Sequence, residues 1–169
     1  MVSEGYGEGA GEGRGGKVDD DLKLAGFVVG HGLYGIDIMR IKEVIQAKPY
    51  RIRPVPQAPP IVEGVIQLRG VVIPVIDLRR RFGVAVDPAL EHLNKLIIVS
   101  VSGRIAGLKV DRVVGELRVP SRSLRPAPSM LRGDVDADLS DDIFSGVCRV
   151  DDDMVFVVNL DGLLKVTRR

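Results

Sequence analysis

Few side chains in this chain have the types needed for catalysis or metal binding, because it contains one cysteine and two histidines. His31 stands in an expected hairpin turn and His92 in a polar stretch. Neither has a cysteine or acidic neighbour at the spacing of zinc ligands. Cys148 falls within an expected strand, where a lone thiol is more typical of a small core side chain than of a nucleophile. We therefore predict no catalytic residue, no metal site and no cofactor.

The amino-terminal residues contain two formal phosphate-binding patterns. GEGRGG at 11–16 fits G-x-G-x-x-G, and GEGRGGK at 11–17 fits the start of a phosphate-binding loop. Val18 stands where that loop needs serine or threonine, and both patterns require a buried strand before them and a helix after them. The glycine-rich stretch provides neither, so we predict a flexible tail over residues 1–18 and no nucleotide site.

Two segments carry opposite charge. Residues 39–83 hold nine basic residues against three acidic ones, whereas residues 134–153 hold eight aspartates against a single arginine. The stretch 134–142 resembles the start of a calcium loop, but Leu139 and Ser145 stand where such a loop needs glycine and glutamate. It is better explained as a solvated acidic loop, with weak metal binding as a minor alternative.

The triple arginine of DLRRRF, residues 77–82, could contact nucleic-acid phosphates. Stacking of bases also needs aromatic side chains, and only Phe82 is nearby, so a basic solvated turn is the better interpretation. A formal net charge of +1 gives no reason to expect a nucleic acid or a membrane surface as partner. No apolar run approaches the roughly 20 residues of a membrane span, and a single cysteine indicates a reducing, cytoplasmic setting.

The elements that position these residues are short and mostly extended. The 169 residues suit one domain, and a 45% hydrophobic content with 4% aromatics predicts a core of Val, Ile and Leu. Strands are expected at residues 22–29, 33–38, 61–68, 71–78, 95–101, 104–117, 144–150 and 154–160. Residues 39–47 are amphipathic but short, and helical turns are expected at 77–83 and 161–166. This pattern predicts a mainly β protein built from one or more small barrels, with no internal repeat of fixed period.

The stretch GVIQLRGVVIPVIDL, residues 64–78, predicts a hairpin that reverses at Arg69 and Gly70. Arg69 is then projected at the end of the hairpin, where its guanidinium can bind a carboxylate or carbonyl groups. Pro74 cannot donate a ladder hydrogen bond, so its strand is expected at a sheet edge or locally unpaired. From the residues alone, an ordinary exposed arginine is the favoured interpretation of Arg69.

GVIQLRGVVIPVIDLRRRFG closely resembles the CheW-type coupling proteins of bacterial chemosensory systems. Further matches follow in order along the chain: YGIDIMRIKEV at 34–44, VDRVVGEL at 110–117, LRPAP at 124–128 and MVFVVNLDGLL at 154–164. The resemblance spans roughly residues 22–166. Gln67 departs from the usual asparagine, and the segment 132–142 is unusually acidic.

The resemblance implies two small five-stranded SH3-like barrels that share an apolar core, in a domain over residues 19–169. It also implies a non-catalytic adaptor between the cytoplasmic tip of chemoreceptors and the regulatory domain of a CheA-type histidine kinase. Such an adaptor is cytoplasmic and is recruited to the inner membrane through receptor arrays. Ile41, Glu43, Gly64 and Arg69 fall where family members contact receptor or kinase. An adaptor of a non-flagellar pathway, or a small-ligand-binding β-barrel, is the alternative.

Overall fold

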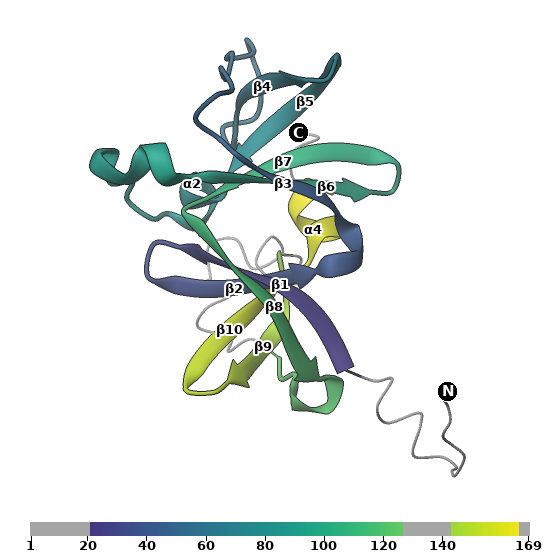
Figure 1. The fold of residues 1–169 in the computed structure, drawn as a ribbon. Helices are drawn as coiled ribbons and strands as arrows, with labels where there is room; N and C mark the ends of the chain where they lie inside the picture. The colour runs from purple at the N-terminus through teal and green to yellow at the C-terminus, as the bar shows by residue number, and fades with distance from the viewer. Residues whose placement is uncertain (1–20, 127–142, 166–169) are drawn as a thin grey trace, which may run out of the picture.

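Ten strands in two five-stranded sheets make up most of the residues that the structure, a computed structural model, describes, namely 21–126 and 143–165. The expected flexible tail over residues 1–18 and the acidic stretch 134–142 lie outside these ranges. The sheets are stacked one above the other in Figure 1, with the described part of α4 between them. The expected mainly β fold with two five-stranded units and short helical turns is confirmed.

Sheet A occupies the lower half of Figure 1. Its strands, in spatial order, are β8 (Arg112–Pro120), β1 (Asp21–Val29), β2 (Gly32–Asp37), β10 (Asp153–Val158) and β9 (Phe144–Val150). All neighbours are antiparallel except β2 and β10, which are parallel. The helix α4 (Leu160–Lys165) follows β10 directly.

Sheet B has the same pattern of directions. Its spatial order is β3 (Ile41–Gln46), β6 (Lys95–Val101), β7 (Arg104–Val110), β5 (Val71–Asp77) and β4 (Val62–Leu68). Only β5 and β7 are parallel. The short helices are η2 (Ile38–Arg40), α2 (Leu78–Phe82), η3 (Pro88–Leu93) and η4 (Ser121–Ser123).

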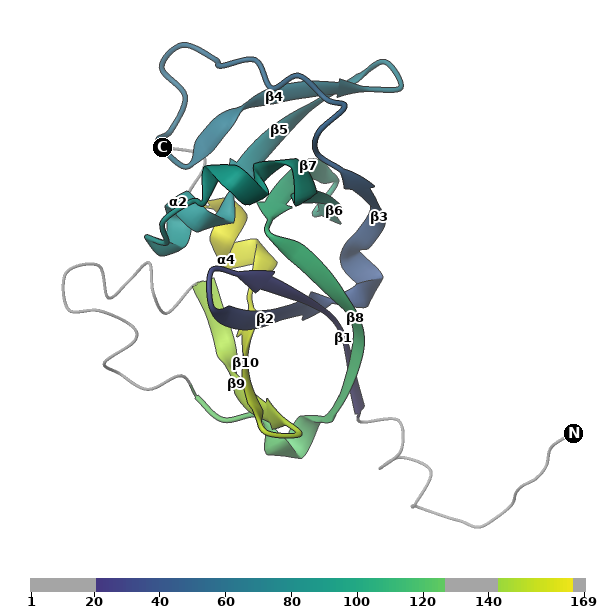
Figure 2. The same ribbon diagram turned by 60° about the vertical axis from the view of Figure 1, so that its left-hand side comes forward.

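The largest apolar cluster lies between the two sheets and takes side chains from both. Phe27 and Ile36 come from sheet A, Ile97 and Leu108 come from sheet B, and all four are fully buried. Leu163 of α4 is also fully buried in this cluster, in keeping with the position of α4 between the sheets in Figures 1 and 2. The two sheets therefore share one apolar core.

The registers of the antiparallel strands reveal an internal repeat. Lys23 pairs with Arg118 in sheet A, and Lys95 pairs with Gln46 in sheet B. Lys23 and Lys95 are 72 positions apart, and so are Gln46 and Arg118. The register shift in the β1–β8 pair and the register shift in the β3–β6 pair also fall at equivalent positions. Strands β1, β2 and β3 are therefore equivalent to β6, β7 and β8.

The remaining strands repeat with a longer step. The pair Val65–Pro74 of β4 and β5 corresponds to Val147–Phe156 of β9 and β10, a step of 82 positions. The change from 72 to 82 explains why no fixed period is visible in the sequence. Each sheet combines two strands of one repeat with three of the other, so the repeats are interlocked.

Three local expectations need correction. The expected strand over 104–117 is two strands in different sheets, because the chain leaves sheet B and enters sheet A at Asp111. The amphipathic stretch 39–47 consists of part of η2 followed by the edge strand β3. The edge position expected for Pro74 is wrong, since β5 is an inner strand; the alternative of a local gap fits, because pairing with β7 begins only at Val75.

Candidate protein-interaction surface

The β4–β5 hairpin reverses in two residues, Arg69 and Gly70, as the sequence predicts. Both have positive φ angles, 50° for Arg69 and 82° for Gly70. Two successive residues of this kind match the right-handed twist of a two-residue hairpin. Glycine adopts this conformation freely, whereas arginine does so at some cost in free energy, which the sequence pattern did not reveal.

Arg69 forms a bidentate ion pair with Glu43. Its two terminal nitrogens, Nη1 and Nη2, donate to Glu43 Oε2 at 2.5 Å and Oε1 at 2.9 Å. These hydrogen bonds hold the pKa of Glu43 below its usual value, and they also raise the pKa of Arg69. The pair remains largely accessible, with 68% of the Arg69 side chain exposed. Two of the sequence-predicted contact residues are thus brought together in one solvent-facing group.

The pair connects the two edges of sheet B. Glu43 belongs to β3 and Arg69 follows β4, and these strands lie at opposite ends of the sheet order. A second connection comes from Arg53, whose backbone exchanges two hydrogen bonds of 2.9 Å with Val65 of β4. The sheet is therefore curled, and the two bonds from Glu43 hold the guanidinium in one orientation.

Gly64 is buried beneath the segment that contains Arg53. A Cβ atom at this position would collide with the carbonyl oxygen of Arg53 and lie 3.0 Å from Ile52 Cγ2. Glycine is needed here because two backbone segments approach closely. Gly64 thus supports the surface from below, whereas Arg69 lies on it.

Ile41 is half-buried and packs against the main core cluster. Sequence reasoning gave core and contact positions equal weight for this residue, and the structure gives it a clear packing role. More exposed aliphatic residues lie beside Arg69: Val71 is 49% exposed and Val72 is 62% exposed. Val71 and Val72 are both exposed, and the first buried residue of this strand is Ile73. The exposure of two successive valines therefore does not follow the alternating pattern expected of a strand.

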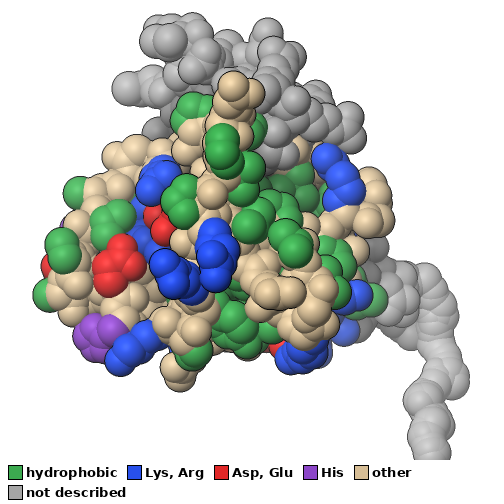
Figure 3. Space-filling view, turned by 90° about the horizontal axis from the view of Figure 1, so that it is seen from above, with side chains coloured by type: hydrophobic (Ala, Val, Ile, Leu, Met, Phe, Trp, Pro, Cys, Tyr) green, Lys and Arg blue, Asp and Glu red, His purple; other side chains and the backbone are tan. Residues whose placement is uncertain are grey.

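We call the exposed group around the hairpin the β4–β5 surface. It consists of Arg51, Arg53, Arg69, Val71 and Val72, together with Glu43 and the half-buried Tyr50. Arg51 and Arg53 form no ion pair with any described residue, so the surface carries an excess of positive charge. Figure 3 looks onto this end of the molecule and shows hydrophobic and basic side chains next to one another. Such a mixture is typical of a protein-binding surface.

The basic stretch DLRRRF is not a single solvated turn. Arg79 is 1% exposed and lies in an ion network: it donates to Asp77 at 2.9 Å and contacts Asp111 at 3.3 Å and Glu91 at 3.4 Å. Burial alone would lower the pKa of Arg79, but the bonds to Asp77 and the nearby carboxylates raise it instead. This arginine holds together α2, η3 and the point where the chain changes sheets. It is unavailable to a phosphate backbone.

The other groups that could do chemistry form no metal-binding cluster among the described residues. Cys148 is buried in an apolar cluster of sheet A, and burial raises the pKa of its thiol. Within residues 21–126 and 143–165, no three His, Cys, Asp or Glu side chains are grouped so that they could hold a metal ion. In the same ranges, every helix is too short or too polar to cross a membrane. The two interlocked sheets and the exposed β4–β5 surface are those of a protein-binding module.

Comparison with known proteins identifies the family. The family model for the CheW-like domain matches residues 23–168. The chemotaxis protein CheW of Rhizobium meliloti is 33% identical over 87% of this chain and 90% of its own length. That of Helicobacter pylori is 29% identical over 87% of this chain and 84% of its own. The crystal structure of the scaffolding protein TtCheW from Thermoanaerobacter tengcongensis matches with a TM-score of 0.69 and 33% identity, covering 81% of this chain and 88% of that one.

The chain belongs to the CheW family. It is a scaffold or adaptor of chemotaxis signalling, and members of this family are non-catalytic. The family and adaptor role expected from the ordered motifs are thereby confirmed. Sequence reasoning missed the buried network of Arg79 and the exposed pair Val71 and Val72. Asp77 was the available sequence signal for the Arg79 network, because it lies two positions before Arg79 and its side chain caps the start of α2.

Proposed function

We propose that this protein joins the regulatory domain of a CheA-type histidine kinase to the cytoplasmic tip of a chemoreceptor, in the cytoplasm beneath the receptor arrays. An adaptor of this kind needs two separate surfaces, one for each partner. The observation that carries the proposal is the β4–β5 surface, where Glu43 orients Arg69 beside exposed Val71 and Val72. Gly64 supports this surface from below, and Ile41 packs against the core between the sheets.

The β4–β5 surface is the proposed kinase contact. An oriented arginine beside exposed aliphatic groups can bind a carboxylate or backbone carbonyls on another protein while the valines exclude water around it. Arginine and large apolar residues of this kind supply most of the binding free energy at protein interfaces. We assign the kinase to this surface because it projects from one end of the molecule, where a second β domain has room to approach (Figure 1).

The second surface lies where the two sheets meet. Strands β3 and β8, one from each sheet, run on the same side of the molecule in Figures 1 and 2. Exposed apolar side chains occur along this side: Met39 is 84% exposed, Val44 is 42% exposed and Val114 is 41% exposed. Separated apolar residues on a shallow surface suit the apolar stripe of a helix, which is why we assign the receptor tip here.

Binding of the full chain to the two purified partners tests this proposal. We expect binding to the kinase regulatory domain and to the receptor tip, and a ternary complex when all three proteins are mixed, as measured by size-exclusion chromatography with light scattering. Val114→Glu should weaken receptor binding by at least about tenfold, since it places a charge in an apolar contact, and it should leave kinase binding unchanged. Binding to neither partner, or strict competition between them, would contradict the adaptor role.

A further inference from the structure

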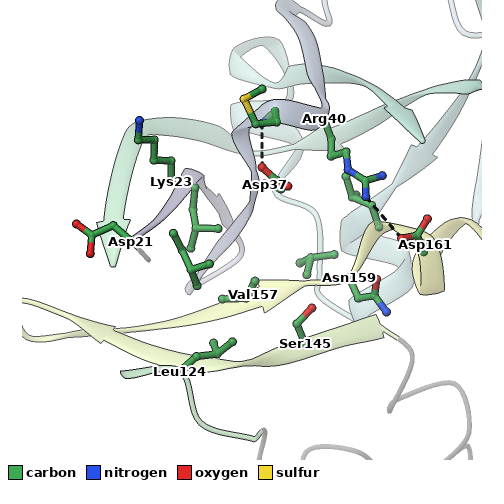
Figure 4. Close-up of a pocket in the computed structure, with 14 residues that line it drawn as sticks. Asp21, Lys23, Asp37, Arg40, Leu124, Ser145, Val157, Asn159 and Asp161 are labelled. Carbon is green, nitrogen blue, oxygen red and sulfur yellow. Dashed lines mark hydrogen bonds and ion pairs between the residues drawn. The ribbon is translucent and has the colours of Figure 1, made fainter. Parts of the chain in front are cut away.

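Two crevices of the molecule share pairs of equivalent residues and differ in charge. The first, shown in Figure 4, is lined by Lys23 and Arg40 among others. The second is lined by the equivalent residues Lys95 and Arg112, each 72 positions further along the chain. It lies where the β1–β2 hairpin of sheet A meets the start of β6 in sheet B. The two crevices can therefore be compared at these equivalent basic residues.

The first crevice has more acidic than basic side chains. Arg40 points towards Asp161, at 3.8 Å between Nη2 and Oδ2, as Figure 4 shows. Asp21 and Asp37 also line this crevice, so it holds three carboxylates against two cations. An anion entering here would meet acidic side chains as well as basic ones, and nothing about the crevice favours its binding.

The second crevice has unpaired positive charge. Lys48, Lys95 and Arg112 line it, and none of the three forms an ion pair or a hydrogen bond with any described residue. His31 and His92, the only histidines of the chain, line the same crevice. Three fixed cations therefore line one cavity.

Two carboxylates, Asp87 and Asp111, line this crevice against its three cations, so its net charge is positive. Asp111 accepts a hydrogen bond of 2.6 Å from the backbone N–H of Gly30, and its other oxygen faces buried Arg79 at 3.3 Å. Asp87 accepts a hydrogen bond of 3.0 Å from the backbone N–H of Ala89 and caps η3. Neither carboxylate pairs with a lysine of the crevice or with Arg112.

The crevice also has the size and apolar lining of a small-molecule site. Its volume is about 780 Å³, within the roughly 300–1,000 Å³ of ligand pockets. Leu90 and Leu93 of η3 line it and are 51% and 53% exposed, so they offer apolar surface to a ligand. Three fixed positive charges favour a multivalent oxyanion over a single carboxylate, and arginine suits phosphate oxygens in particular.

We propose that this crevice binds a small molecule that carries a phosphate or pyrophosphate group on an apolar body. Lys48, Lys95 and Arg112 contact the phosphate oxygens, and Leu90 and Leu93 contact the apolar body. The site is separate from the β4–β5 surface and does not depend on the proposed partners. An acidic peptide is the competing occupant, but a concave cavity of this size favours a compact ligand over an extended chain.

Titration calorimetry of the full chain with inorganic pyrophosphate and with ATP tests the proposal, with ionic strength held constant by sodium chloride. We expect saturable binding of both, with ATP tighter because its ring reaches the leucines. Lys95→Gln combined with Arg112→Gln should weaken binding by at least about tenfold, since two charge-assisted contacts are lost. The matched control is Lys23→Gln combined with Arg40→Gln in the equivalent crevice, which makes the same change in net charge and should alter affinity by less than about twofold.

Lys48→Gln is a second variant that keeps the test decisive if the double variant fails to fold, because Lys48 is exposed and unpaired. It should weaken pyrophosphate binding about threefold or more. Heats that never saturate, or equal losses in both double variants, would overturn the proposal. Equal affinity for pyrophosphate and ATP would overturn the role of the leucines, and binding of polyglutamate in place of both would assign the crevice to an acidic peptide.

Discussion

The two hairpin tips of the repeats start with the same backbone conformation but carry opposite charge. Arg69 in the β4–β5 hairpin and Asp151 in the β9–β10 hairpin are equivalent residues, and their φ angles are 50° and 55°. In sheet B the tip is bound to Glu43 of the far edge strand. In sheet A the residue equivalent to Glu43 is Gly115, which has no side chain to offer.

This difference separates what the fold requires from what is specific to one surface. Both repeats keep the two-residue turn and the buried glycine below it, Gly64 in one and Gly146 in the other. Only sheet B adds the ion pair between its edges. The turn and the glycine therefore belong to the architecture, whereas Arg69 and Glu43 are additions that shape a surface. The predictions below test that division.

The largest effect on stability is expected from Arg79→Met. This change removes a buried cation and leaves Asp77, only 3% exposed, without its partner, so the free energy of unfolding should fall by about 3–5 kcal/mol. The equivalent residue of the second repeat is Asp161, whose side chain is 60% exposed. Asp161→Ala should change the free energy of unfolding by less than about 0.5 kcal/mol. Urea unfolding measures both, and equal effects would show that the two repeats are stabilised in the same way.

An intermediate effect is expected from alanine at the two buried glycines. A Cβ on Gly64 would meet the carbonyl oxygen of Arg53, and a Cβ on Gly146 would meet that of Arg125 at 2.5 Å. Because backbone must shift in both cases, each change should lower the free energy of unfolding by about 1–3 kcal/mol. If Gly64→Ala unfolds at the wild-type urea concentration, the glycine is not needed for packing and acts in some other way.

The smallest expected effect is the pH dependence of stability that the Arg69–Glu43 pair gives to sheet B. The hydrogen bonds from Arg69 lower the pKa of Glu43 in the folded state, so this carboxylate favours folding at neutral pH. That contribution is lost as the pH falls through the usual range of a glutamate towards the lowered folded-state pKa, where both states become protonated. The difference in urea midpoint between wild type and Glu43→Gln should therefore shrink between pH 7 and pH 3. A difference that stays constant would show that the pair does not stabilise the fold.

Much of the fold could be predicted because short β-branched segments and turn residues are local signals. The hairpin at Arg69 and Gly70 is the clearest case, and most of the expected strands are present. The change of sheet at Asp111 could not be predicted, since nothing in a local pattern says which sheet a strand joins. The repeat was also hidden, because the step between equivalent residues changes along the chain.

The candidate site could be predicted only in part, for similar reasons. Arg69 was expected at the hairpin tip, but its bond to Glu43 was not. The two residues are 26 positions apart in the sequence, and they meet only because the sheet is curled. Arg79, Arg80 and Arg81 look alike as a triplet, yet Arg79 is 1% exposed whereas Arg80 is exposed. The geometry of the helix that begins after Asp77 determines which of the three arginines is buried. The three identical residue types do not reveal this.

The most direct test of the central claim is the affinity of the full chain for a CheA-type kinase regulatory domain, measured for Arg69→Glu and for the matched tip variant Asp151→Lys. Both sites are exposed turn residues, so neither change should alter the free energy of unfolding by more than about 1 kcal/mol. We predict that Arg69→Glu weakens binding by at least about tenfold and that Asp151→Lys alters it by less than about twofold. Equal affinities for Arg69→Glu and wild type would contradict the claim that the β4–β5 surface is the docking site.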